Sequence, residues 1–162
     1  MVDLVIPVYK PKDEFAQLLY KIKKQTVPVH KIILMNTEKE YWDEFIGKHS
    51  EIETYDNLEI HHISREEFDH GNTRNKGISY SDAEYILLMT QDALPENEFL
   101  VEKLLQSFEN EGVALAYARQ LPREECREAE KFTRSFNYPQ ESVMKSEKDI
   151  EKLGIKAFFC SD

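Results

Sequence analysis

Residues 2–8, VDLVIPV, decide the class of fold. This short apolar run is rich in β-branched residues, which is typical of parallel strands that are covered on both faces. The runs KIILM at residues 31–35 and YILLM at residues 85–89 have the same character, and LEIHHI at residues 58–63 is a further strand candidate. The sequence therefore predicts a buried, mostly parallel sheet.

Segments with helical periodicity separate these strands. Apolar residues recur at helical spacing between residues 14 and 25, at Phe15, Leu18, Leu19 and Ile22. Further helices are predicted over residues 39–48, 72–81 and 96–110, and a fifth strand over residues 113–118. Alternating strands and helices indicate an α/β protein with a parallel sheet and helices on both faces.

The pattern weakens after residue 118. We expect a short helix over residues 124–131 and another over 146–153, which Ser146 caps and Gly154 ends. A last apolar run at residues 157–160 predicts a new strand. Because a domain seldom ends on a strand that has just begun, we expect one domain over residues 1–162 that is truncated at its C-terminus.

Composition excludes several classes of function. The 162 residues include 31 acidic and 21 basic side chains, giving a formal net charge of −10. Such a surface repels nucleic acid and disfavours broad docking on anionic membranes. A phosphate-bearing ligand would therefore need a local cation or a metal.

Cysteine usage and hydropathy bear on the compartment. Cys126 and Cys160 lie far apart and have no CxxC partner, which favours a reducing environment. No signal peptide is recognisable, and no apolar run reaches the roughly 20 residues of a membrane span. We expect a cytoplasmic protein.

Polar residues follow the predicted strands. Right-handed crossovers place the carboxyl ends of parallel strands at one edge, where open α/β sheets bind ligands. Four segments should therefore meet there: Pro7-Val8-Tyr9, Asn36-Thr37, Thr90-Gln91-Asp92, and residues 68–77, which read FDHGNTRNKG. Tyr9 can lie against a base, and Asn36 can hydrogen-bond a base or a ribose.

The same edge suits a diphosphate. Arg74 can donate two parallel hydrogen bonds to phosphate oxygens, and the start of the third helix adds backbone N–H groups. His70 lies beside Gly71 at the presumed site. Asp92 can hold Mg²⁺ or Mn²⁺ that bridges the phosphates. These residues together predict a site for a nucleoside diphosphate.

Each of these residues also has a structural interpretation. Asp92 can be a turn residue, and Arg74 can pair on the surface with Asp69 or Asp82. Tyr9 can belong to the core.

The sequence gives less support for a functional role of several other residues. Gly71 and Gly77 can simply serve turns of the backbone. Neighbouring strand residues point to opposite faces, so His61 and His62 are not expected to share a metal ion. The sequence contains no nucleophile elbow that would indicate a hydrolase.

The motifs resemble those of family 2 glycosyltransferases of the rhamnosyltransferase-like kind. The resemblance rests on VIPVY at residues 5–9, on residues 68–77, and on MTQDALP at residues 89–95. It continues through residues 119–123, 134–139 and 159–162 and so covers essentially the whole chain.

The resemblance implies a GT-A (Rossmann-like) fold and an inverting sugar transfer. A carboxylate would deprotonate the acceptor hydroxyl, and a divalent cation, Mg²⁺ or Mn²⁺, would stabilise the departing diphosphate. The donor would be dTDP- or UDP-linked. The acceptor would be a saccharide or a lipid-linked saccharide of a surface polysaccharide, which could bring the protein to the inner face of the membrane.

Site residues follow by matching the motifs. The metal ligand would be Asp92, the last carboxylate of the family's DxD motif, with Thr90 in place of the first. The nucleotide-sugar-binding set would be Pro7, Val8, Tyr9, Asn36, His70, Arg74, Asn75 and Gln91. Asn36 replaces an aspartate of the family, and Gln91 would face the ribose or the diphosphate.

The catalytic residue is left unknown. The family's general base follows the segment that residues 159–162 resemble, and Asp162 falls on a different family segment. Residues 1–118 would form the nucleotide-binding βα core, and residues 119–162 would begin the acceptor-side portion.

Two other functions compete with the transferase. A non-catalytic nucleotide-binding or assembly module would explain Asn36 and the absent base. A nucleotidyltransferase would need a Gly-rich basic loop after the first strand, and residues 9–12, YKPK, contain no glycine.

Overall fold

The computed structural model describes residues 1–122, 126–138 and 140–154. The chain forms two compact units, Met1–Ala114 and Leu115–Asp162. The sheet and its helices belong to the first unit.

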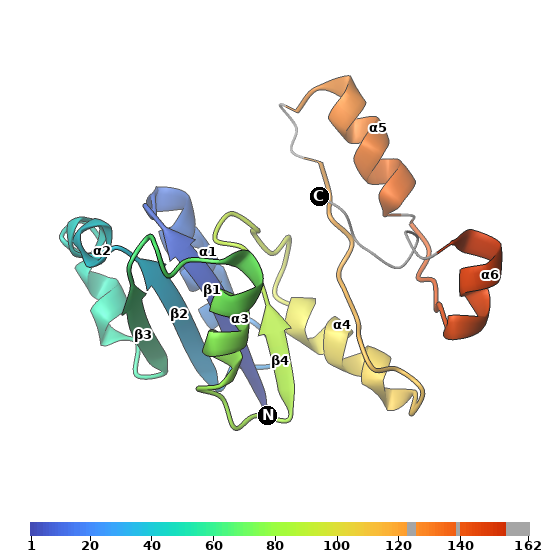
Figure 1. Ribbon diagram of the computed structural model, residues 1–162, viewed down its shortest axis with the longest axis horizontal. Helices are drawn as coiled ribbons and strands as arrows, with labels where there is room; N and C mark the ends of the chain where they lie inside the picture. Colours follow the sequence, from blue (N-terminus) through green and yellow to red (C-terminus); the bar gives the residue numbers. More distant parts are fainter. Residues whose placement is uncertain (123–125, 139, 155–162) are drawn as a thin grey trace. The chain divides into compact units, whose positions relative to one another are not determined.

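Four parallel strands form the sheet (Figure 1). They are β1 (Val2–Tyr9), β2 (Lys31–Thr37), β3 (Leu58–Ile63) and β4 (Tyr85–Leu88), in the order β3-β2-β1-β4. All three strand pairs are parallel, as predicted. The central strands β1 and β2 are almost entirely buried because helices cover both of their faces.

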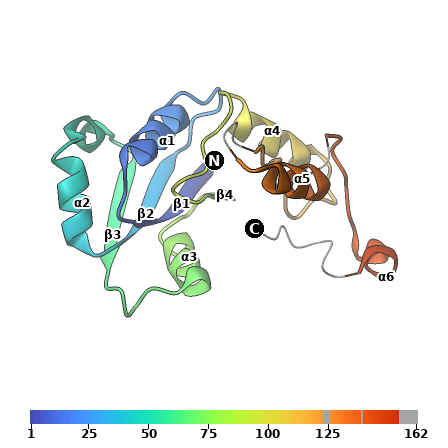
Figure 2. The ribbon, with the colours of Figure 1, turned by 90° about the horizontal axis from the view of Figure 1, so that it is seen from above.

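The helices divide between the two faces (Figure 2). One face carries α1 (Asp13–Lys23), α2 (Lys39–Ile46) and α4 (Leu100–Gln106), whose apolar residues pack on the even-numbered residues of β1 and β2. On the other face, α3 (His70–Ile78) lies over a smaller cluster around Val5, Ile33 and Met35. This arrangement confirms the α/β class.

A buried carboxylate joins three elements at the amino ends of the strands. Asp3 of β1 is fully buried, and its Oδ1 lies 2.9 Å from His30 Nδ1. Its Oδ2 accepts a hydrogen bond of 2.5 Å from Ser81 Oγ. Asp3 thus ties β1 to the segments that lead into β2 and β4, a role that the apolar pattern of β1 did not reveal.

The predicted fifth strand is wrong. Residues 113–118 form no strand, and Leu115 and Tyr117 are exposed. An apolar run forms a strand only where a partner strand supplies the hydrogen bonds, and among the described residues β4 pairs only with β1.

Several helices differ from their predicted bounds. The fourth helix begins later, at Leu100, and ends as the 3₁₀ turn η2 (Ser107–Glu109). The 3₁₀ turn η1 (Ser50–Thr54) follows α2. In the second unit, α5 spans Glu128–Asn137 instead of residues 124–131, of which 124 and 125 lie outside the described residues.

The last predicted helix is confirmed as η3 (Glu147–Asp149) followed by α6 (Ile150–Leu153). Ser146 and Asp149 form a reciprocal capping box, and Gly154 ends the helix with φ of 73°. The predicted strand at residues 157–160 lies outside the described residues. Within the described ranges, no helix combines the length and apolar character needed to cross a bilayer.

Candidate functional site

The side chain of Gln91 fastens the turn after β4 to the end of β1. Its Oε1 accepts a hydrogen bond from Tyr9 N at 2.8 Å, and its Nε2 donates to Tyr9 O at 2.9 Å. The structure therefore brings two of the predicted binding segments together. Both polar groups of the Gln91 amide are used in this contact, so Gln91 shapes the edge through the backbone of Tyr9.

Aromatic rings and cations surround Tyr9. Its ring meets Tyr41 of α2 edge-on, with centroids 5.5 Å apart, and its hydroxyl accepts a hydrogen bond from Arg65 Nη1 at 3.2 Å. Lys10 Nζ lies 5.1 Å from the centroid of Tyr9 and 4.7 Å from that of Tyr41. We call Tyr9, Lys10, Tyr41 and Arg65 the tyrosine–cation cluster.

Three members of this cluster, Lys10, Tyr41 and Arg65, were not predicted from the sequence. Lys10 directly follows the first strand and Arg65 lies two residues after the third, so the rule that selected Tyr9 also applies to them. Tyr41 lies within a helix, and nothing in the sequence alone linked it to the sheet edge.

Asn36 is fully buried at the end of β2. Its Nδ2 donates to Glu38 O at 3.1 Å and lies 3.0 Å from His62 Nδ1. Partial desolvation, and then the positive charge of Lys39, lower the pKa of His62, although this residue remains exposed. A neutral imidazole can accept the hydrogen bond of Asn36, so these contacts fix which way the amide points. Among the described atoms, Asn36 Oδ1 has no hydrogen-bond partner.

The two faces of the sheet separate the predicted residues. Val8, Asn36 and His62 are paired across neighbouring strands, so they share the face covered by α1 and α2. Pro7, by contrast, is half-buried and is paired with Met35, which packs on the α3 side. Residues on opposite faces of the sheet can contact the same ligand only if that ligand lies at the carboxyl edge.

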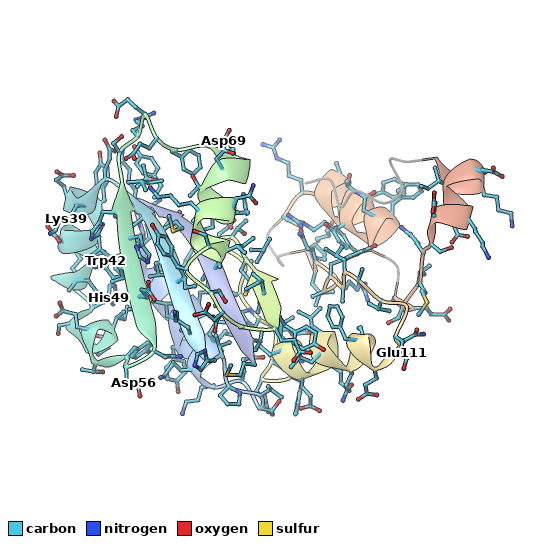
Figure 3. All side chains as sticks on the ribbon, turned by 60° about the horizontal axis from the view of Figure 1, so that its bottom comes forward. Lys39, Trp42, His49, Asp56, Asp69 and Glu111 are labelled. Atoms are coloured by element: carbon cyan, nitrogen blue, oxygen red, sulfur yellow. The ribbon has the colours of Figure 1, made fainter. Side chains whose placement is uncertain are left out.

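The start of α3 differs from its predicted role. Asp69 lies at the start of α3 (Figure 3). Its carboxylate accepts hydrogen bonds from Gly71 N at 3.1 Å and Asn72 N at 2.8 Å. Two of the backbone N–H groups that we assigned to a phosphate, those of Gly71 and Asn72, are therefore taken by the chain's own cap. A helix N-terminus favours a negative charge, and here that charge is the carboxylate of Asp69.

Three predicted residues lie on α3. Arg74 Nη1 donates to His70 O at 2.8 Å, one turn earlier in the helix. His70 and Asn75 are exposed, and the His70 ring meets Phe68 edge-on with centroids 5.0 Å apart. The neighbouring histidines His61 and His62 do not share a site: His61 stacks on Tyr80, whereas His62 contacts Asn36.

Asp92 is exposed in the turn that follows β4, which Ala93 N closes on Thr90 O at 3.2 Å. The described residues contain no group of three or more potential metal-binding side chains. Mg²⁺ commonly binds one or two carboxylates and takes its other ligands from phosphates and water. A single carboxylate at this position fits such a shared site.

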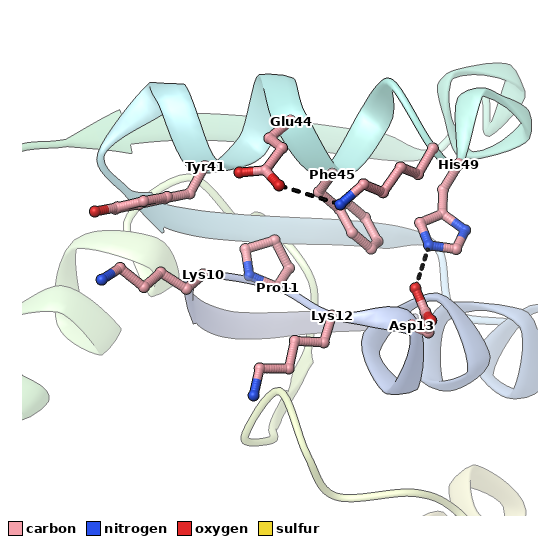
Figure 4. Close-up of a pocket in the computed structure, with 9 residues that line it drawn as sticks. Lys10, Pro11, Lys12, Asp13, Tyr41, Glu44, Phe45 and His49 are labelled. Carbon is pink, nitrogen blue, oxygen red and sulfur yellow. Dashed lines mark hydrogen bonds and ion pairs between the residues drawn. The ribbon is translucent and has the colours of Figure 1, made fainter.

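A pocket of about 500 Å³ opens between α2 and the segment that joins β1 to α1 (Figure 4). Ion pairs border it, Lys48 with Glu44 at 3.1 Å and His49 with Asp13 at 3.0 Å. None of the predicted site residues lines this pocket. It is lined by Lys10, Pro11, Lys12, Asp13, Tyr41, Glu44, Phe45, Lys48 and His49, and so shares Lys10 and Tyr41 with the tyrosine–cation cluster.

Comparison with known proteins settles the family. The model of glycosyl transferase family 2 matches residues 3–162. The chain belongs to glycosyl transferase family 2. This family 2 chain is 33% identical over 162 residues to the O-antigen chain rhamnosyltransferase RfbN of Salmonella typhimurium, covering 99% of the chain and 50% of that relative.

A second rhamnosyltransferase gives the same result. The O-antigen chain rhamnosyltransferase WbaN of Salmonella anatum is 33% identical over 161 residues, which cover 98% of the chain and 49% of WbaN. The chain thus spans about half the length of these curated relatives.

Solved structures confirm the GT-A fold of this family 2 chain. TarS 1–349 of S. aureus matches 75% of the chain and 38% of its own length, with a TM-score of 0.53 at 16% identity. TarS 1–349 in complex with UDP-GlcNAc matches 75% of the chain and 37% of its own length, with a TM-score of 0.51 at 16% identity.

Proposed function

We propose that this chain is the donor-binding part of a glycosyltransferase that moves rhamnose or another deoxysugar from a nucleoside diphosphate to a polysaccharide acceptor. The observation that carries the proposal is the carboxyl edge of the sheet, where the segments ending in Tyr9 and Asp92 are joined through Gln91. The rhamnosyltransferase relatives support the choice of sugar. TarS, whose fold the chain shares, was solved with UDP-GlcNAc, which supports a nucleotide-sugar donor.

In this proposal, different residues of the chain bind different parts of the donor. Tyr9 lies at the base, Pro7 and Val8 set the backbone beneath it, and Asn36 meets the base or ribose with a neutral amide. His70, Arg74 and Asn75 approach from α3 towards the phosphates.

We assign Mg²⁺ or Mn²⁺ to Asp92. When bound, the cation would stabilise the negative charge on the departing diphosphate. The proposed transfer inverts the anomeric centre, because the acceptor hydroxyl attacks in line from the side opposite the diphosphate. A saccharide or lipid-linked saccharide acceptor would place the protein at the inner face of the membrane.

A second candidate is a nucleotide-binding module that performs no transfer. The buried amide of Asn36, where the family has a carboxylate, favours it. The two functions separate in a transfer assay on a protein that spans the full length of the relatives, because both bind nucleotide but only the transferase releases free nucleoside diphosphate when donor and acceptor are supplied.

A thermal-shift panel tests the donor site. We expect dTDP or UDP, but not GDP or CMP, to raise the melting temperature, and to do so more strongly with Mn²⁺. A ligand that binds only the folded state at 100 times its Kd adds about 2.7 kcal/mol of stability. Unchanged melting with every nucleotide, with and without metal, would contradict the proposal.

A further inference from the structure

Lys10 has an unusual backbone conformation for a residue other than glycine. Its φ is 49°, in the left-handed region that the Cβ of an ordinary residue disfavours. Among the described residues, the only other non-glycine with positive φ is Glu38, at 64°. The two follow the central strands β1 and β2 directly. Strained residues held by their surroundings are common at ligand sites.

The side chain of Lys10 indicates why a lysine occupies this position. Its ammonium lies over the rings of Tyr9 and Tyr41, at 5.1 and 4.7 Å from their centroids. The guanidinium carbon of Arg65 lies 5.7 Å from the centroid of Tyr9, and Arg65 also donates to the Tyr9 hydroxyl. Tyrosine rings therefore hold two cations at one edge of the sheet.

Neither cation has a salt bridge among the described residues, although Glu66, the neighbour of Arg65 in the sequence, interacts with Arg65 electrostatically. In the described part of the structure, no carboxylate lies within salt-bridge distance of Lys10 or Arg65, although acidic side chains outnumber basic ones by 31 to 21. Tyr41 and then Tyr9 raise the pKa of Lys10, so its ammonium is charged at neutral pH. Two cations that lie on tyrosine rings and have no described salt bridge, on an acidic protein, favour an anionic ligand.

We propose that Lys10 and Arg65 bind the phosphates of the donor nucleotide, with Tyr9 and Tyr41 positioning them. This inference rests on the proposed function and names the chain's own cations for the diphosphate. The guanidinium can donate two parallel hydrogen bonds to phosphate oxygens, and the ammonium supplies a compact positive charge. Arg74 is therefore not the only basic residue that serves the phosphates.

The test compares a nucleoside with its mono- and diphosphate. Affinities of uridine, UMP and UDP, and of the thymidine series, are measured by calorimetry on the 162-residue chain in EDTA, so that no metal contributes. A residue that binds phosphate contributes to the gain in affinity from nucleoside to diphosphate. A residue that binds base or ribose changes all three affinities equally.

We expect Lys10→Gly and Arg65→Gln each to reduce the gain from nucleoside to diphosphate by roughly tenfold or more, with little change for the nucleoside. Lys10→Gly should also keep or raise the melting temperature, because glycine adopts positive φ without strain.

Three variants serve as controls. Glu38→Gly relieves the same backbone strain without removing a cation and should leave the gain in affinity from nucleoside to diphosphate unchanged. Arg65→Lys preserves the charge and should retain part of the gain in affinity that Arg65→Gln loses. Lys23→Gln removes a positive charge far from the cluster and should leave all three affinities unchanged.

Three results would overturn the assignment. Variants that bind the diphosphate as the wild type does would show that the cations do not contact it. Variants that weaken the nucleoside and the diphosphate equally would move the contact to the base or ribose. A wild-type chain that binds no nucleotide, either in EDTA or with Mn²⁺, would refute the proposed function as well, whereas in the first two cases the donor site stands.

Discussion

At the residue scale, Asp92 carries the metal assignment. The carboxylate is exposed, so Asp92→Ala should leave the fold intact and remove the Mn²⁺-dependent part of nucleotide stabilisation. Melting curves with and without Mn²⁺ and nucleotide measure that part. Asp82→Ala removes an exposed aspartate before the start of β4 and serves as the matched control. An Asp92→Ala chain with an unchanged manganese effect would place the metal elsewhere.

His62 predicts a pH dependence of stability. Its pKa is lowered in the folded chain, chiefly by partial desolvation and next by Lys39. Asp43 and Glu40 act in the opposite direction, and His61 adds a smaller lowering effect. A folded pKa below the unfolded one means that the unfolded chain binds more protons in this range. The contribution of His62 is therefore present above pH 6.5 and is lost as the pH falls through the folded pKa.

His62→Gln isolates this contribution. Melting temperatures at about pH 7.5 and about pH 5 should differ less in the variant than in the wild type, because the variant has no imidazole to protonate beside Asn36. An equal decrease in both chains would show that other groups control the acid response.

At the element scale, α3 depends on a glycine for its contact with the sheet. A Cβ at Gly77 would lie 2.5 Å from Val5 Cγ1 and 3.1 Å from Met35 Cγ. Both neighbours belong to buried central strands and have little room to move. Gly77→Ala should therefore push α3 outward and lower the free energy of unfolding by about 1–3 kcal/mol.

Gly71 in the same helix is the matched control. A Cβ there has Asp69 Oδ1 as its nearest neighbour, at 3.6 Å, so Gly71→Ala should be neutral or slightly stabilising. Denaturant unfolding of both variants gives the comparison. Equal stabilities of the two variants would mean that α3 does not pack as closely as described.

The elements also show how far periodicity can predict a fold. The apolar runs of β1 to β4 located the four described strands, and the helical spacing of Phe15, Leu18 and Ile22 located the helix α1. The run at residues 113–118 looked equally strand-like, yet no strand forms there. A strand exists only with a partner, and partners are set by topology.

At the scale of the whole molecule, the first unit contains the sheet and nearly all of the core. Every buried apolar residue of the described chain except Tyr138 lies between Val2 and Val101. We therefore predict that a fragment of residues 1–114 folds alone and melts cooperatively. Circular dichroism and calorimetry of this fragment provide the measurement. A fragment that shows no cooperative transition would mean that the first unit needs the remainder of the chain.

The sequence by itself determined the α/β class, the parallel sheet and the family motifs. Strand and helix periods are local properties, and the carboxyl edge follows from the handedness of βαβ connections. Tertiary structure alone decided that Gln91 binds the backbone of Tyr9 and that Lys10 and Arg65 lie on the rings of Tyr41 and Tyr9. These contacts join residues from different elements, and Gly77 likewise proved to permit close packing of α3 instead of a turn. Distances between side chains on separate elements depend on how the elements pack, which the spacing of residues along the chain does not encode.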